Sequence, residues 1–262
     1  MTAIDIQLSP ANTDWATLRA ATVLAEQRGY RAVFVFDHLA GLPLEGTTML
    51  ECFGVLGALV EVTTTVELGT MVANVWNRQV GTLVSAAATI ATLSGRQFHL
   101  GIGAGAAPAS RWAAEQHAVG AVLAPSLEER HARVEEVIDL AARQWTPDRD
   151  AELATFPFPA RRPTVLVGVN SVRLSRLAGR RADGVNVPWR HPRRDEFLAA
   201  ADETAGDRPF LRTAYTSFRP ELLDPAHPDR VAMTDRRIER LVLAVFDTLD
   251  GWIADGELPS SA

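Results

Sequence analysis

The sequence lacks several features that would narrow its function at once. Its 262 residues include one cysteine, Cys52, which excludes an internal disulfide and fits a reducing, cytoplasmic location. No apolar run approaches the roughly 18 residues of a membrane span. The first residues, MTAIDIQLSPAN, have no basic segment of the kind that begins a signal peptide. We therefore expect a cytoplasmic protein with no membrane partner.

An excess of positive charge is also missing. The net charge is −6 and no basic stripe is present, so nucleic acid is not expected as a partner. The histidines and the cysteine show no spacing typical of a metal site, and no P-loop or Gly-x-Ser-x-Gly motif occurs. We therefore expect no metal site and no nucleic-acid partner. The expected partner is a small-molecule substrate, and a homodimer stays open.

What the sequence does contain is a regular alternation of short apolar runs and helical periodicity. We expect strands at Ile4–Leu8, Arg31–Phe36, Thr64–Met71, Gln97–Ile102, Thr164–Val167, Gly184–Val187 and Phe210–Phe218. Helices are expected between them, at Asp14–Arg28, Thr48–Val62, Arg78–Leu93, from Ser126 onward, and at Ser171–Arg181 and Pro192–Ala205. This order and length predict an α/β fold, a single (β/α)8 barrel over residues 1–262.

Two segments are harder to assign. About 20 residues, Ala104 to Pro125, read as a loop with no helix, and loops of that length are usually functional or mobile. Near the C-terminus, Leu241–Phe246 looks like an eighth barrel strand, whereas the spacing of apolar residues from Ile238 to Ile253 favours a helix. Both assignments stay open, and the barrel is expected to be shortened or irregular at this end.

Three segments at expected strand ends are candidates for chemistry. Asp37 and His38 directly follow the second strand, where barrel enzymes place functional side chains, and histidine is the usual acid or base near neutral pH. The alternative is that Asp37 caps the next turn and His38 is merely exposed.

The glycines of Gly101–Ala106 match the GxGxxA pattern of dinucleotide sites. They follow the fourth strand and not the first, Pro108 comes soon after, and no helix is expected before Ser126. A dinucleotide site is therefore disfavoured, and the glycines indicate close approach of a ligand or tight turns. The third segment, Gly168–Ser171, suits a phosphate at a helix N-terminus or is an ordinary turn with Asn170 or Ser171 as N-cap.

Taken in order, GYRAVFVFDHL, LGTMVANVWNRQ, AAATIATLSGRQFHLGIGAGA and RPTVLVGVNSVRLSRLAGRRADGVN resemble the luciferase-like monooxygenase family, also called luciferase-like hydride transferases. The resemblance covers roughly residues 1–190. It implies a (β/α)8 barrel that binds FMN or the deazaflavin coenzyme F420 at its C-terminal face. The Asp37-His38 pair and the GTMV strand look most like the deazaflavin branch.

The resemblance also implies roles for individual residues. Asp37 and His38 match the catalytic pair beside the deazaflavin ring, with His38 as the acid or base. Met71-Val72 matches a bulge behind the ring, often with a non-proline cis peptide, and Asn74 matches a contact to the ring edge. Two loops complete the implied cofactor site: Gly103, Ala104 and Gly105 near the ring, and Gly168, Val169, Asn170 and Ser171 at the phosphate.

The chain also departs from the family pattern. A second glycine is common where Val169 stands, a glutamate where Ala106 stands (although Glu115 lies downstream), and a tryptophan where Cys52 stands. Three functions follow as hypotheses. The first is an F420-dependent oxidoreductase that transfers a hydride to or from a small organic substrate. The second is an FMN-dependent monooxygenase, and the third is a non-catalytic cofactor-binding barrel.

Overall fold

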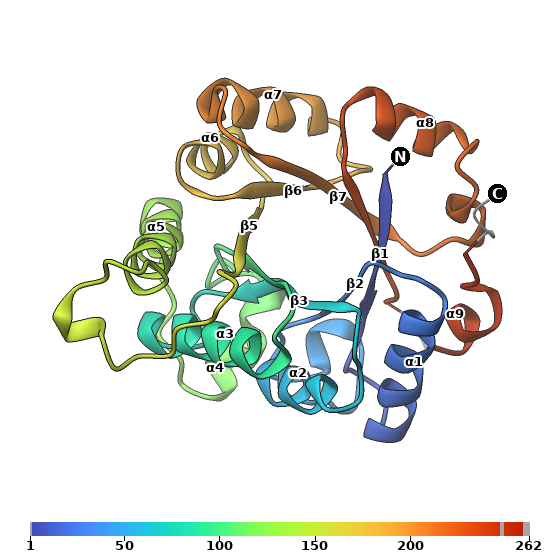
Figure 1. The fold of residues 1–262 in the computed structure, drawn as a ribbon, viewed down its shortest axis with the longest axis horizontal. Helices are drawn as coiled ribbons and strands as arrows, with labels where there is room; N and C mark the ends of the chain where they lie inside the picture. The colour runs from blue at the N-terminus through green and yellow to red at the C-terminus, as the bar shows by residue number, and fades with distance from the viewer. Residues whose placement is uncertain (1, 247–248, 259–262) are drawn as a thin grey trace.

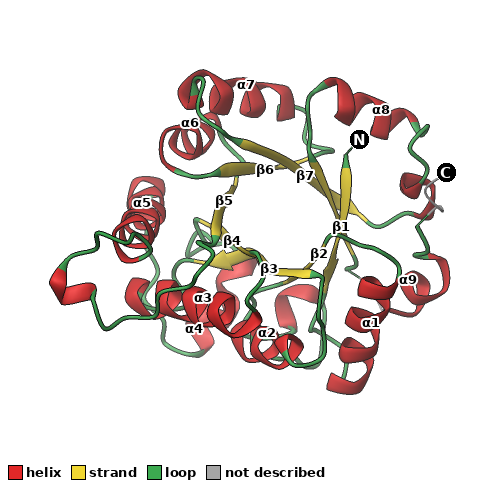
Figure 2. Ribbon diagram, in the orientation of Figure 1, coloured by secondary structure: helices red, strands yellow, loops and turns green. Residues whose placement is uncertain are grey.

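The computed structural model describes residues 2–246 and 249–258. Within them, eight parallel strands pair in chain order, and β1 pairs with β8 to close a barrel (Figure 2). The strands are β1 (Ala3–Leu8), β2 (Ala32–Val35), β3 (Glu67–Asn74), β4 (Phe98–Gly103), β5 (Thr164–Gly168), β6 (Gly184–Pro188), β7 (Leu211–Ser217) and β8 (Arg240–Ala244). The predicted α/β barrel is confirmed.

Helices surround the ring of strands (Figure 1). They are α1 (Trp15–Gln27), α2 (Cys52–Val60), α3 (Val80–Ser94), α4 (Ala114–Ala118), α5 (Leu127–Gln144), α6 (Val172–Arg181), α7 (Arg194–Ala205), α8 (Pro228–Asp235) and α9 (Leu249–Asp255), with short 3-10 turns at Leu42–Leu44, Arg111–Ala113, Ala151–Leu153 and Pro220–Leu223. None of the described helices has the length and apolarity that a membrane crossing needs.

The C-terminal segment contains both a strand and a helix, the two alternatives that its sequence left open. β8 is buried throughout and hydrogen-bonds to β7 on one edge and β1 on the other, which completes the barrel; it is not shortened there. The helical spacing continues into α9, where Trp252 packs edge-on against Tyr30, with ring centroids 5.7 Å apart. Pairing on both edges satisfies the backbone groups of residues 240–244, and this outweighs their helical periodicity.

Most element boundaries differ from the prediction by one or two residues, α8 was not predicted, and three further differences are described here. α2 begins only at Cys52 because Glu51 caps it and accepts from the Gly54 N–H at 2.7 Å. β3 begins at Glu67 because the N–H groups of residues 64–66 bind the Glu26 carboxylate. The loop before Ser126 contains a short helix, α4, which the sequence analysis did not expect.

The amino end of the barrel interior is filled by an ion network. Arg240 makes two 2.7 Å hydrogen bonds to Asp5 and one of 2.7 Å to Glu67, and Glu67 lies 2.8 Å from His99 Nε2. All four side chains are buried. Burial alone would raise the pKa of Glu67, but the hydrogen bonds and charges of His99 and Arg240 lower it to about 2. His99 thus belongs to the barrel interior, where Nε2 contacts Glu67, while its buried Nδ1 has no hydrogen-bond partner among the described residues.

Candidate active site

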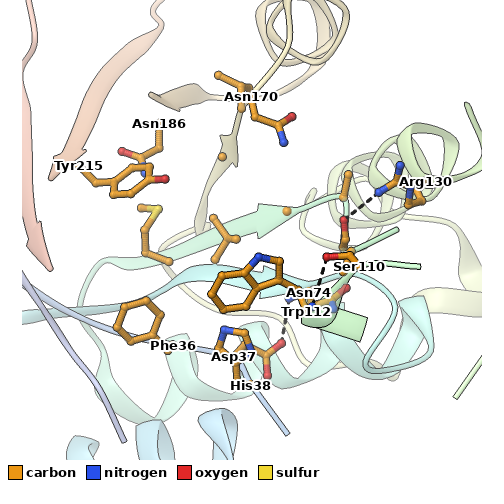
Figure 3. Close-up of a pocket in the computed structure, with 18 of the residues that line it drawn as sticks. Phe36, Asp37, His38, Asn74, Ser110, Trp112, Arg130, Asn170, Asn186 and Tyr215 are labelled. Carbon is orange, nitrogen blue, oxygen red and sulfur yellow. Dashed lines mark hydrogen bonds between the residues drawn. The ribbon is translucent and has the colours of Figure 1, made fainter. Parts of the chain in front are cut away.

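A cavity of about 620 Å³ opens at the carboxyl ends of the strands (Figure 3). It brings together every predicted site residue except Ser171, namely Asp37, His38, Met71, Val72, Asn74, Gly103, Ala104, Gly105, Gly168, Val169 and Asn170. Ser171 instead caps α6, where its hydroxyl accepts from the Leu174 N–H. Residues far apart in sequence thus meet where barrel enzymes place their sites.

The floor of the cavity is a bulge in β3. The register of β3 against β4 shifts between Thr70 and Ala73, and the Met71–Val72 peptide is cis, as the resemblance implied. Both residues line the cavity. The side chain of Gln7 in β1 donates to the Met71 carbonyl oxygen and holds the bulge from below.

The glycines of β4 and β5 make room for this bulge. A Cβ on Gly103 would lie 2.6 Å from Cγ2 of Val72, and one on Gly168 would lie 2.7 Å from its Cγ1. A Cβ on Gly101 would clash with the Thr70 carbonyl oxygen and would lie 3.2 Å from the Met71 sulfur. These glycines therefore leave room for β3; Gly103 and Gly168 also line the cavity, and the approach of a ligand to them stays a prediction. Of these neighbouring glycines, Gly105 has a positive φ of +75°, a backbone conformation that favours glycine.

His38 is held by a carboxylate that lies 77 residues further along the chain. Its Nδ1 is 3.0 Å from Oε1 of Glu115, whose Oε2 accepts the Leu39 and Ala40 N–H groups at 2.8 and 3.0 Å. The Glu115 side chain is 1% exposed. Burial raises its pKa, but the hydrogen bonds from His38 and the two backbone N–H groups outweigh burial, so the pKa of Glu115 is lowered.

Asp37 is buried and its carboxylate is fully engaged. Arg78 donates to both of its oxygens at 2.8 Å, and the Asn74 N–H donates to Oδ2 at 2.9 Å. Arg78 also pairs with Glu51. These contacts tie the end of β2 to the end of β3 and the start of α3, so Asp37 positions the backbone on either side of His38.

Aromatic side chains form the walls beside His38. The ring of Trp112 lies beside that of His38 (Figure 3), with their centroids 6.1 Å apart. The ring centroids of Phe36 and Phe246 are 5.5 Å apart. Trp112 and Phe246 are 39% and 45% exposed, unusually high for rings that line a cavity. No role was predicted for these aromatic residues from the sequence, and the length of the loop after β4 was the signal for Trp112. Glu115 was noted only as a glutamate downstream of Ala106, and its contact with His38 was not predicted.

The opposite side of the cavity carries positive charge. Arg130 lies across the cavity from Phe36 and donates to the Gly105 carbonyl oxygen at 3.3 Å (Figure 3). Beside it, the first turn of α6 has backbone N–H groups without intrahelical partners, which attract anions. The Val169 N–H is not among them, because it donates to the Asn186 carbonyl oxygen at 3.0 Å.

A buried polar side chain, Asn186, and a partly buried one, Tyr215, face the cavity between these walls. Asn186 is 1% exposed, and its Oδ1 accepts from the Thr213 hydroxyl at 2.7 Å, which leaves its amide N–H groups for a ligand. Burial raises the pKa of the Tyr215 hydroxyl, so this group stays protonated near neutral pH. No cluster of histidine, cysteine and acidic side chains suited to a metal ion occurs in the part of the chain that the structure describes.

Comparison with known proteins gives consistent matches. The model of a family described as luciferase-like monooxygenase matches residues 1–207. A protein named F420-dependent glucose-6-phosphate dehydrogenase from Nakamurella multipartita is 30% identical over 230 residues, which are 84% of this chain and 59% of that protein. One of the same name from Intrasporangium calvum is 31% identical over 197 residues, 70% of this chain and 57% of that protein. The chain thus spans little more than half the length of these curated relatives.

Solved structures show the same fold at lower identity. An F420-dependent secondary alcohol dehydrogenase in complex with an F420-acetone adduct superposes with a TM-score of 0.75 at 16% identity, covering 97% of this chain and 96% of that one. A coenzyme F420-dependent tetrahydromethanopterin reductase from Methanopyrus kandleri gives 0.61 at 17% identity, covering 91% and 76%. At such identities the likeness shows the fold alone.

Proposed function

Because the chain belongs to the luciferase-like monooxygenase family, we propose that it is an oxidoreductase that transfers a hydride between coenzyme F420 and a small organic substrate. The observation that carries this proposal is the cavity over the β3 bulge, with His38 beside it. The curated relatives named as F420-dependent dehydrogenases support the choice of coenzyme.

The residues of the cavity fit a deazaflavin. Met71 and Val72 offer an apolar floor for a flat ring system. The amide of Asn186 offers hydrogen-bond donors to the ring or its polyol chain. Arg130 and the first turn of α6 offer a positive end for the coenzyme phosphate. This charge difference would orient the coenzyme, with its phosphate near α6 and its ring above the bulge.

Within this site His38 would carry the proton of the reaction. When bound, the coenzyme supplies a ring carbon, C5, that accepts or donates a hydride. A carboxylate can only accept a hydrogen bond, so an ionised Glu115 requires Nδ1 of His38 to carry a proton. The other ring nitrogen, Nε2, is then free to take a proton from a substrate hydroxyl. Glu115 is thus a positioning residue, and Asp37 holds the backbone around the pair.

Titration of the purified chain with oxidised F420, and separately with FMN, tests this function. We expect saturable quenching of deazaflavin fluorescence and at least tenfold weaker binding of FMN. The absence of F420 binding at tens of micromolar would contradict the proposal. A protein that purifies yellow with FMN and consumes oxygen would be a monooxygenase instead. A matched pair, His38→Ala and the exposed His117→Ala, separates catalysis from binding, since both variants should keep the coenzyme but only the first should lose turnover.

A further inference from the structure

We infer that the substrate of this site is an uncharged alcohol or carbonyl compound with hydrocarbon substituents, and not a phosphate ester. This inference rests on the proposed function and concerns the part of the cavity around His38. It follows from the charges and surfaces that meet there.

The side chains that line the His38 end of the cavity offer no free positive charge to an anion. All 26 basic residues of the chain are arginines, and each lies in the part that the structure describes. Of these arginines, Arg130 alone lines the cavity, on the far side from Phe36 (Figure 3). Arg78 is bound to Asp37 and Glu51, and Arg111 stacks on the ring of Trp112 but is exposed and does not line the cavity. An anionic substrate at His38 would therefore find no free cationic side chain in the wall of the cavity at this end.

The carboxylate of Glu115 would also repel an anion, whereas that of Asp37 is paired with Arg78. Glu115 is buried 3.0 Å behind His38, so a charged group next to Nε2 would lie roughly 8 Å from it. At an effective dielectric constant of about 20, that repulsion weakens binding by about 30-fold. Discrimination by an uncompensated like charge is a common way to reject a partner.

Asp37 and Glu115 do not favour the binding of a cationic substrate. Both oxygens of Asp37 accept hydrogen bonds from Arg78, and Glu115 accepts from His38, two backbone N–H groups and Gln116. With these acceptors occupied, an ammonium group would gain only the distant attraction of Glu115, equal in size to the repulsion of an anion, and would lose its water without a direct ion-pair contact. Amines are therefore disfavoured along with anions.

The remaining surface around His38 is aromatic. The ring of Trp112 lies beside that of His38, and Phe36 and Phe246 pack together in the lining of the same cavity. Trp112 and Phe246 are more than a third exposed. Hydrocarbon substituents that cover the exposed apolar surface of a cavity bind with a favourable change in free energy. An alcohol bound there would lose the hydride of its C–H bond to the oxidised deazaflavin and its hydroxyl proton to His38 Nε2. The product is a neutral carbonyl compound, and the reverse reaction reduces it.

Saturation-transfer NMR with three matched probes, cyclohexanol, cyclohexyl phosphate and cyclohexylamine, tests the inference on the whole chain, with and without F420. We expect cyclohexanol to bind at least tenfold more tightly than either charged probe. Equal or tighter binding of the phosphate or the amine, or no binding of cyclohexanol, would overturn it. If F420 itself fails to bind, the proposed function fails, while the ranking of the probes without coenzyme still decides the charge preference.

A charge added at the rim gives an independent readout. In Phe246→Arg a guanidinium replaces an exposed ring of the cavity, so cyclohexyl phosphate should gain at least fivefold in affinity over the unmodified chain. Leu93→Arg adds the same charge at a residue that is 61% exposed and does not line the cavity, and it should change nothing. An equal gain in both variants, or none in Phe246→Arg, would contradict the inference.

Discussion

The two ends of this barrel use the same residue types for opposite purposes. At the amino end, Arg240 and His99 meet Asp5 and Glu67 in a closed network of hydrogen bonds. At the carboxyl end, His38 meets Glu115, but the outer nitrogen of its ring is left beside an open cavity. A histidine enclosed by charged partners contributes to stability, and one with a free face is available for chemistry. The predictions below test this division.

Removal of His38 should have the largest effect, on turnover alone. A positioned general acid or base contributes about 10²-fold to 10⁴-fold to rate. We therefore expect His38→Ala to lose turnover by that factor while its melting temperature and F420 affinity stay close to those of the parent. Steady-state kinetics beside thermal unfolding measures both. A variant that unfolds early but keeps its turnover would reverse the assignment of the two ends.

Removal of Arg240 should act on stability alone. Arg240→Met leaves Asp5 and Glu67 buried without their common partner, which costs about 3–5 kcal/mol in the free energy of unfolding. Arg31→Ala removes another partner of Glu67, one that is 64% exposed, and should cost less than about 1 kcal/mol. Urea unfolding distinguishes the two. Similar losses in both variants would mean that the network does not depend on burial.

The glycine beneath the bulge gives an intermediate effect. Gly103→Ala places a Cβ 2.6 Å from Val72 and should cost about 1–3 kcal/mol, with weaker coenzyme binding. Gly81→Ala, in α3 with no atom within 4 Å of the added Cβ, should stabilise the chain by about 0.5–1 kcal/mol. If Gly103 makes room for the Val72 side chain, the double variant Gly103→Ala with Val72→Ala should regain stability. If Gly103 only makes room for the ligand, the double variant should not regain it.

Neutralising Glu115 should have a smaller effect on turnover. Glu115→Gln keeps the size of the side chain but removes the charge that fixes the Nδ1 proton of His38, so turnover should fall about tenfold or more. Nitrogen-15 NMR of labelled histidine checks the cause. In the parent the Nδ1-protonated form of His38 should dominate, and in Glu115→Gln the two tautomers should mix. An unchanged spectrum and pH profile would leave Glu115 no role beyond packing.

The acid dependence of stability should come from the amino end. Burial and the Arg240 charge lower the pKa of His99, so below the ordinary value of 6.5 the unfolded chain binds a proton that the folded chain does not. Glu67, with its pKa lowered to about 2, contributes stability above its ordinary value of 4.5 that is lost as the pH falls from there toward 2. Melting temperature should fall in both windows. The melting temperature of Glu67→Gln should change less between pH 4.5 and 2 than that of the parent chain. An equal change in both would contradict the assignment to Glu67.

The sequence predicted the barrel because alternating apolar runs mark each strand and helix locally. It also brought Asp37, His38, Met71 and Gly168 to one face, since parallel strands end on the same side. It could not predict that Glu115 reaches His38, because no local pattern records a contact across 77 residues through an irregular loop. Nor could the sequence show that Gly103 and Gly168 face the side chain of Val72, because the presence of a glycine does not indicate which atoms lie next to it.

The most direct test of the central claim is a single-turnover reaction of the chain with oxidised F420 and cyclohexanol, followed by the loss of deazaflavin absorbance. We expect reduction by the parent chain, slower reduction when the carbinol carbon carries deuterium, and a bound but unreduced coenzyme in His38→Ala. Reduction at the same rate by His38→Ala, or no reduction of bound F420 by the parent chain with any uncharged alcohol, would contradict the claim that the carboxyl end of this barrel is a hydride-transfer site.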